Sequence, residues 1–386
     1  MAYNEVQLFV VELVGTALSV LFGLGAVANA LLPGTKGHGF GVMGIALCFG
    51  FGVFVAVQAV GHVSGLLNPA ITFGVAVAGR MTWKRAGIAI CAQFIGAFLA
   101  ALITWVVYLP HFQPLTGCIQ ESISDEMLAR EHPETPRQKK VHVFQEMTSK
   151  ARRYASSGRA PSTRDVLRHD SEGDVLKGVH IHSGKHTWHV FQSLNNCIKA
   201  RPEKSGAIED LEMTSKPGLP APKLDLDATV ARKQRIKLDE RIREDQEVKL
   251  VVFATRPSTL EPFHWTALLA EAVMTFVLTY GALAIIDREV VFGANEVAKT
   301  AYKAQVPYLI GVLVWAVILA GGGVTGPALN PARDLSPRIA HFLLPIPGKG
   351  SSEWHYAWVP VIGPVIGATL GALFAEAMKK LHESGL

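Results

Sequence analysis

The clearest functional motif of this chain is an asparagine-proline-alanine tripeptide that occurs twice. The copies lie at Asn68-Pro69-Ala70 and Asn330-Pro331-Ala332, and Arg333 follows the second copy. Asparagine is a good helix N-cap and proline is favoured at the first helical position, so each tripeptide predicts the start of a helix. The stretches that follow, 71–78 and 333–342, leave room for only about two or three turns. Each helix would present an electropositive N-terminus and a side-chain amide, which can donate hydrogen bonds to a neutral solute.

The tripeptides belong to a longer internal repeat. Glu12 to Thr16 and Glu271 to Thr275 share the pattern Glu-x-x-x-Thr. Glu12 precedes the first Asn by 56 positions, and Glu271 precedes the second by 59. Related Ile-Gly-Ala segments follow each tripeptide, at 95–101 and 366–372. Self-similarity of this length in apolar sequence is typical of an internally duplicated membrane protein.

Glu12 and Glu271 each lie within an apolar stretch. A charged side chain at the centre of a membrane helix costs about 2.5 kcal/mol or more, so each carboxylate requires a partner. We expect these partners to be backbone N–H groups of the loop that leads to each tripeptide. A proton relay is the alternative interpretation.

Six apolar stretches are each about long enough to cross a bilayer. They are Leu8–Leu31, Phe40–Val60, Ala86–Tyr108, Trp265–Ile286, Val306–Ala320 and Tyr356–Met378. The sequence therefore predicts an all-α membrane protein with six transmembrane helices, two re-entrant half-helices and an inverted internal repeat. Irregular backbone at membrane depth needs protein or water around it, so the half-helices predict a polar path between their N-termini. Residues 5–111 and 251–380 would form the two pore repeats.

A polar insert, 112–250, separates the repeats. It holds 24 of the 37 Lys and Arg residues and 21 of the 32 Asp and Glu residues. Such a composition is too polar for a core of its own, so we expect a largely irregular segment with a charged helix over 232–249, lying on a surface. Basic residues in the short loops predict a cytoplasmic N-terminus and therefore an extracellular insert. These residues are Arg80, Lys84, Arg85, Arg288, Lys299, Lys303, Lys379 and Lys380.

The insert also contains the weak candidates for other chemistry. Imidazoles at close spacing suit zinc, copper or nickel. The cluster comprises His180, His182, His186 and His189, although its Gly- and Ser-containing sequence favours a solvated loop. Cys118 and Cys197 could form a disulfide, but the four cysteines show no spacing of a disulfide framework.

Several function classes find no support in the sequence. The net charge of +5 is not gathered into a long basic run, which argues against a nucleic-acid partner. The chain shows no paired nucleophile and base and no nucleotide motif, so we expect neither an enzyme nor a cofactor. An adhesion or sensor protein that acts through the insert is the alternative from another class.

With these motifs the chain resembles the aquaporin or major intrinsic protein family, and within it the glycerol facilitators. The resemblance covers about residues 5–112 and 250–380. It implies one pore in each subunit of a homotetramer in the lipid bilayer of the cell membrane. It also implies passive diffusion of glycerol, water and other small neutral solutes, with exclusion of ions and protons. A water pore, or a broader pore that admits metalloid acids, is the alternative within the transport class.

The resemblance extends to individual residues. It implies that four residues form the narrow filter, namely Phe49, Ile318, Pro327 and Arg333. Asp334 and Arg338 are similar to residues of the glycerol-conducting members. The chain departs from the family in three ways: the loop before Asn68 is one residue shorter, Pro327 replaces an aromatic residue, and Ile318 stands where glycine is common.

Overall fold

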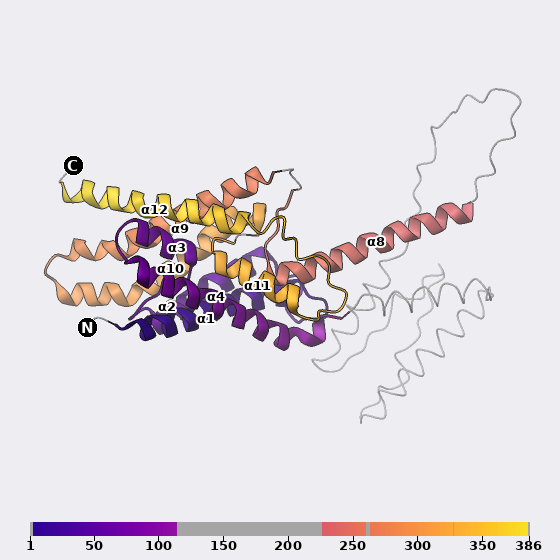
Figure 1. The fold of residues 1–386 in the computed structure, drawn as a ribbon, viewed down its shortest axis with the longest axis horizontal. Coiled ribbons are helices and arrows are strands. Elements are labelled where there is room, and N and C mark those ends of the chain that lie inside the picture. The colour runs from indigo at the N-terminus through magenta and orange to yellow at the C-terminus, as the bar shows by residue number, and fades with distance from the viewer. Residues whose placement is uncertain (1–2, 114–225, 260–262, 327, 385–386) are drawn as a thin grey trace, which may run out of the picture. The chain divides into compact units, whose positions relative to one another are not determined.

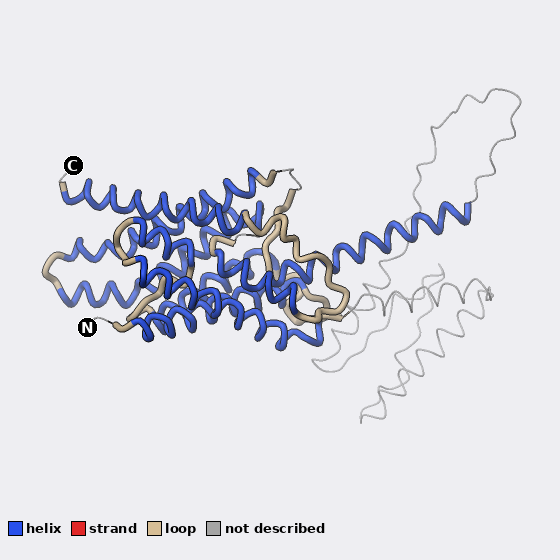
Figure 2. The backbone as a smooth tube through the Cα atoms, in the orientation of Figure 1, coloured by secondary structure: helices blue, strands red, loops and turns tan. Residues whose placement is uncertain are grey.

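The computed structural model describes residues 3–113, 226–259, 263–326 and 328–384. Regular structure in these residues is helical, and they contain no strand (Figure 2). One compact unit comprises residues 1–118 and 226–386. The histidine cluster, Cys118, Cys197 and Pro327 all lie outside the described residues.

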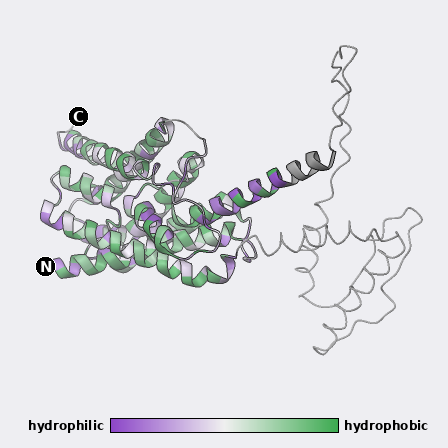
Figure 3. Ribbon diagram, turned by 45° about the vertical axis from the view of Figure 1, so that its right-hand side comes forward, coloured by the Kyte–Doolittle hydropathy of each residue, from purple (hydrophilic) through white to green (hydrophobic). Residues whose placement is uncertain are grey.

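Six long helices confirm the predicted membrane-spanning architecture. They are α1 (Glu5–Leu31), α2 (Gly41–Val60), α4 (Trp83–Tyr108), α9 (Trp265–Asp287), α10 (Glu296–Thr325) and α12 (Val359–Glu383). Hydrophobic residues predominate along these helices (Figure 3), and many are exposed, such as Val107 and Leu269 at 62% and 64%. Large exposed apolar side chains on helices of this length mark a surface that contacts lipid. The chain is a multi-pass membrane protein.

Helix α10 begins well before the predicted start at Val306. Asn295 caps it, because its side-chain oxygen accepts a hydrogen bond from the Ala298 N–H at 2.9 Å. The first turns carry Glu296 and Lys299, which pair with each other at 2.8 Å. Hydropathy alone misses these turns since they are polar.

Two short helices begin at the prolines of the tripeptides, α3 (Pro69–Val77) and α11 (Pro331–Leu343). The side-chain oxygen of Asn68 accepts from the Ala70 N–H at 2.9 Å, and that of Asn330 accepts from the Ala332 N–H at 3.0 Å. Both asparagines thus act as N-caps with the same extended backbone. At the other end of α11, the Lys349 ammonium donates to three terminal carbonyl groups, which is favourable for the helix dipole.

The helices pack as two related halves (Figure 1). Helix α1 packs on α2 and α4, and α9 packs on α10 and α12. Each short helix packs on the last span of the other half, α3 on α12 and α11 on α4. The halves also meet directly where α2 packs on α10.

The repeated Ile-Gly-Ala segments form the closest helix crossings. A Cβ on Gly96 would overlap the carbonyl oxygen of Leu13, and one on Gly367 would overlap that of Ala272. These carbonyls belong to the residues directly after Glu12 and Glu271. Glycine at these points lets α4 approach α1, and α12 approach α9, with backbones in contact.

Helix α8 (Leu226–Phe253) contains the charged helix predicted over 232–249. Its exposed part is hydrophilic (Figure 3). Its last turns are buried, whereas the sequence predicted a surface helix. Lys249 is 1% exposed, and Val252 and Phe253 are fully buried. Near this end α8 packs on α1 and α11. The helix therefore continues past the predicted boundary at residue 250 and packs against the bundle at its C-terminal end.

Candidate functional site

The N-termini of α3 and α11 meet, and each asparagine contacts the opposite loop. The Asn68 amide donates to the Leu329 carbonyl at 2.7 Å, and the Asn330 amide donates to the Leu67 carbonyl at 2.8 Å. A side-chain amide has two N–H groups. One N–H of each asparagine therefore joins the two halves, and the other remains for a solute.

The residue before each asparagine has a left-handed backbone. Leu67 and Leu329 both have φ of 53°, a conformation that costs a side chain such as leucine about 1–2 kcal/mol. Strain of this kind persists only where surrounding contacts enforce it. The enforcing contacts come from the two buried glutamates.

Glu12 and Glu271 hold the two loops in the same way. Glu12 accepts from the backbone N–H groups of Leu66 and Leu67 at 3.0 and 2.9 Å. Glu271 accepts from those of Ala328 and Leu329 at 2.9 and 2.8 Å. Hydroxyl groups of Ser64 and Thr325 complete the matching sets, and Gln93 donates to Glu12 at 2.7 Å. Each carboxylate thus has the partners that its burial requires.

A cavity of about 130 Å³ adjoins the two asparagines. Its wall is mostly aliphatic. The polar side chains that line it are Ser19, Asn68, Asn330 and Arg333. Of the four expected filter residues, Phe49, Ile318 and Arg333 lie in this wall. The site is therefore a largely apolar passage with a few hydrogen-bonding groups.

Arg333 is held by two contacts at the edge of the cavity. Its guanidinium carbon lies 5.1 Å from the centre of the Phe49 ring, within cation–π range. Its Nη1 donates to the Phe253 carbonyl at 3.2 Å. That carbonyl ends α8, where the helix dipole is negative. The Nε atom is buried and has no hydrogen-bond partner among the described residues.

The Phe49 ring packs against Gly23, which leaves room for it because glycine has no side chain. A Cβ on Gly23 would overlap the aromatic ring of Phe49. Gly23 is not among the residues expected from the sequence, although its spacing gives a signal. It lies 11 positions after Glu12, about three helical turns, so both residues share one face of α1.

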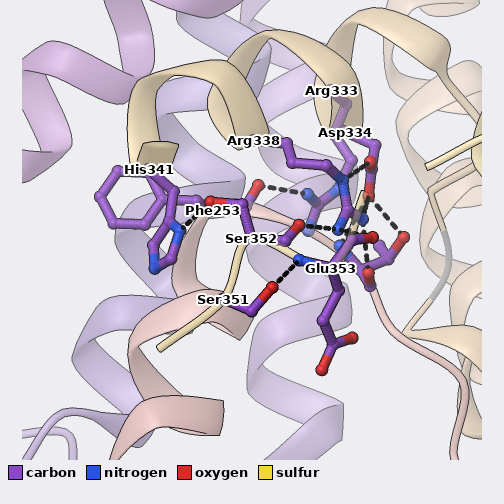
Figure 4. Close-up of polar contacts among 9 residues, drawn as sticks. Phe253, Arg333, Asp334, Arg338, His341, Ser351, Ser352 and Glu353 are labelled. Carbon is purple, nitrogen blue, oxygen red and sulfur yellow. Dashed lines mark hydrogen bonds and ion pairs between the residues drawn. The ribbon is translucent and has the colours of Figure 1, made fainter. Parts of the chain in front are cut away.

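Asp334 and Arg338 do not line the cavity. Both are fully buried, and Arg338 Nε donates to Asp334 Oδ1 at 2.9 Å. Asp334 also accepts from the N–H and the hydroxyl of Thr255, both at 2.6 Å. Arg338 donates to the backbone carbonyls of Thr255 and Ser352 at 2.7 and 2.8 Å (Figure 4). The pair fastens two loops to α11 and thereby supports the helix that carries Arg333.

An ion cluster fastens the other end of α3. Arg80 follows the turn at Gly79 and donates two hydrogen bonds to Asp287, at 2.9 and 2.6 Å. It also pairs with Glu376 of α12. The hydrogen bond with Asp287 is the main cause that raises the pKa of Arg80, so the residue stays charged. No group of three or more metal-ligating side chains occurs in the described part of the chain.

The comparisons with known proteins agree with this geometry. The family model of the major intrinsic proteins matches residues 2–136 and 247–375. The chain belongs to the major intrinsic protein family. A probable glycerol uptake facilitator protein from Thermotoga maritima is 28% identical over 367 residues, covering 95% of this chain and 97% of the relative. The glycerol uptake facilitator protein of Bacillus subtilis is 29% identical over 372 residues, covering 96% and 84%.

A solved structure shows the same fold. The aquaglyceroporin from Plasmodium falciparum aligns with a TM-score of 0.54 at 16% identity, covering 99% of this chain and 100% of the other. Membership of the major intrinsic proteins agrees with the expectation of a transport protein and not an enzyme. This major intrinsic protein thus has the fold of the family. That fold accounts for the internal repeat, the two half-helices and the joined asparagines.

Replacing Gly23 with alanine is expected to lower the osmotic water permeability at least several-fold. The new methyl group would overlap the Phe49 ring and push it into the cavity that the ring lines. The cavity would then be narrower. Stopped-flow light scattering of proteoliposomes measures this rate. Gly25→Ala is the matched control, because a Cβ on Gly25 has no heavy atom within 4 Å. Equal permeability of the two variants would show that Gly23 does not place the ring.

Proposed function

We propose that this protein is a passive channel for glycerol and similar small uncharged solutes, including water. The observation that carries the proposal is the pair of cross-bonded asparagines at the cavity wall. Each supplies an amide N–H at the positive end of a short helix. The relatives named as glycerol uptake facilitators support the choice of solute.

Ion exclusion follows from the same arrangement. Each helix N-terminus carries roughly half a positive charge, and the two N-termini face one constriction. Arg333 adds a full charge at the edge of the cavity. A cation would lose its hydration among mostly aliphatic side chains and meet N–H donors from Asn68, Asn330 and Arg333. A neutral molecule can accept those hydrogen bonds, so it passes along its concentration gradient.

Solute flux into proteoliposomes tests the proposal. Purified protein should raise glycerol and water permeability well above that of protein-free vesicles, without a proton or potassium current. Urea, as a neutral solute of another shape, measures how broad the pore is. Water flux without glycerol flux would reject glycerol as a substrate, and an ionic current would reject the exclusion mechanism.

The membrane, orientation and assembly belong to the same proposal. The protein would lie in the cell membrane as a homotetramer, with its N-terminus in the cytoplasm and the 112–250 insert outside. The basic residues of the short loops support this orientation, among them Arg80 and Lys303. Protease accessibility of the insert in intact cells tests the orientation, and the mass of the detergent-solubilised protein tests the assembly.

A further inference from the structure

Ser19 is a polar residue of the cavity wall that the filter does not include. It lies on α1, seven positions after Glu12 and four before Gly23. Residues with these spacings share one helix face. At 1.5 Å per residue, Ser19 is about 6 Å from Gly23 and about 10 Å from Glu12 along the helix. The side chain thus lies between the level of Phe49 and the level of the re-entrant loop.

The counterpart of Ser19 in the second repeat is Leu278. Glu12 corresponds to Glu271, so seven positions further along each helix Ser19 corresponds to Leu278. Both residues are buried, and both line the same cavity. The repeats agree at the glutamates and the asparagines but differ here. One wall of the cavity therefore bears a hydroxyl group, and the corresponding wall bears a branched hydrocarbon.

Ser19 differs from the other polar lining residues in the hydrogen bond that it can offer. Its hydroxyl donates to the Thr16 carbonyl at 3.0 Å, which is a common bond for serine within a helix. The proton is therefore used by the backbone, and the oxygen lone pairs remain. Asn68, Asn330 and Arg333 contribute N–H donors instead. Ser19 is thus the acceptor among the polar side chains of the described cavity wall.

A polyol needs both kinds of partner. Each of its hydroxyl groups accepts one hydrogen bond and donates another, whereas its carbon chain prefers an apolar surface. A hydroxyl proton left without an acceptor in a narrow passage is unfavourable. Ser19 offers that acceptor, and Leu278 offers the apolar surface on the corresponding wall.

We propose that Ser19 is a specificity-determining residue that accepts a hydrogen bond from a passing polyol while Leu278 contacts its carbon chain. The inference rests on the proposed function, since it requires glycerol conduction. It explains how the pore favours a molecule with two chemically different sides.

Glycerol and water permeability of matched variants in proteoliposomes test the inference. Ser19→Ala should lower glycerol permeability about three- to ten-fold, the factor that one hydrogen bond supplies. Water permeability should change less than two-fold, because water is small enough to use the remaining partners. Ser19→Thr keeps the acceptor and should retain more glycerol flux than Ser19→Ala. Leu278→Ala keeps the acceptor but removes the apolar contact, so it should also lower the ratio of glycerol to water permeability.

The possible outcomes separate the inference from the proposed function. If Ser19→Ala leaves the ratio of glycerol to water permeability unchanged, the inference is wrong while the channel stands. An equal fall in both permeabilities would assign Ser19 a structural role and would also reject the inference. Wild-type protein without glycerol flux would instead reject the proposed function.

Discussion

Arg338→Met is expected to remove most of the folded protein. The substitution leaves the Asp334 carboxylate fully buried without its cationic partner and removes the donor to three backbone carbonyls. Breaking a buried ion pair from one side costs about 3–5 kcal/mol, which is a large part of the stability of most domains. The yield of monodisperse protein in detergent and its thermal unfolding measure the effect.

Two further variants make this prediction specific. The double variant Asp334→Asn with Arg338→Met removes both charges, so it should be more stable than Arg338→Met alone. Lys84→Met breaks the Lys84–Glu5 pair, whose side chains are 74% and 47% exposed, and it should change stability little. Similar stability of Arg338→Met and Lys84→Met would contradict the anchoring role of Arg338.

Lys249→Met is expected to lower stability and also the selectivity of the channel. The buried ammonium donates to the carbonyls of Gln113 and Pro347 at 3.1 and 2.7 Å and pairs with Asp245 at 2.5 Å. Loss of a partner from such a pair costs about 3 kcal/mol or more. It would also loosen the last turn of α8, whose Phe253 carbonyl holds Arg333.

Thermal unfolding and vesicle flux together test this prediction. Lys249→Met should unfold at a lower temperature and admit more urea or protons relative to glycerol than wild type. Lys249→Arg keeps the charge and should restore part of both properties. A less stable protein with unchanged solute ratios would mean that Lys249 supports the fold but not the filter.

The spans and the half-helices were predictable because local physics sets them. A membrane helix requires a long apolar stretch, and asparagine followed by proline favours a helix start wherever it occurs. The start of α10 was not predictable from hydropathy, because its first turns after the Asn295 cap are polar. The resemblance to the family suggested Phe49 and Ile318 as filter residues. Both line the cavity with Arg333, and their role as a filter stays a prediction.

Residues whose role depends on distant partners were harder to predict. Lys249 reads as one more charge on a polar helix, but its acceptors lie 136 and 98 positions away. The roles of Gly23 and Ser19 can be recognised only once Glu12 shows which face of α1 points to the interior of the bundle. Asp334 and Arg338 were associated with the solute by resemblance, whereas the structure gives them backbone and hydroxyl partners away from the cavity wall.

The contact between Gln113 and Lys249 also bears on how this protein can be altered. It holds Gln113 and the last turns of α8 at hydrogen-bonding distance, 3.1 Å. For a flexible tether between fixed ends, each doubling of length adds only about 0.6 kcal/mol. A flexible sequence added between Gln113 and the start of α8 at Leu226 would thus have little thermodynamic effect on the bundle. The position is a natural place to graft an antibody epitope or a fluorescent reporter.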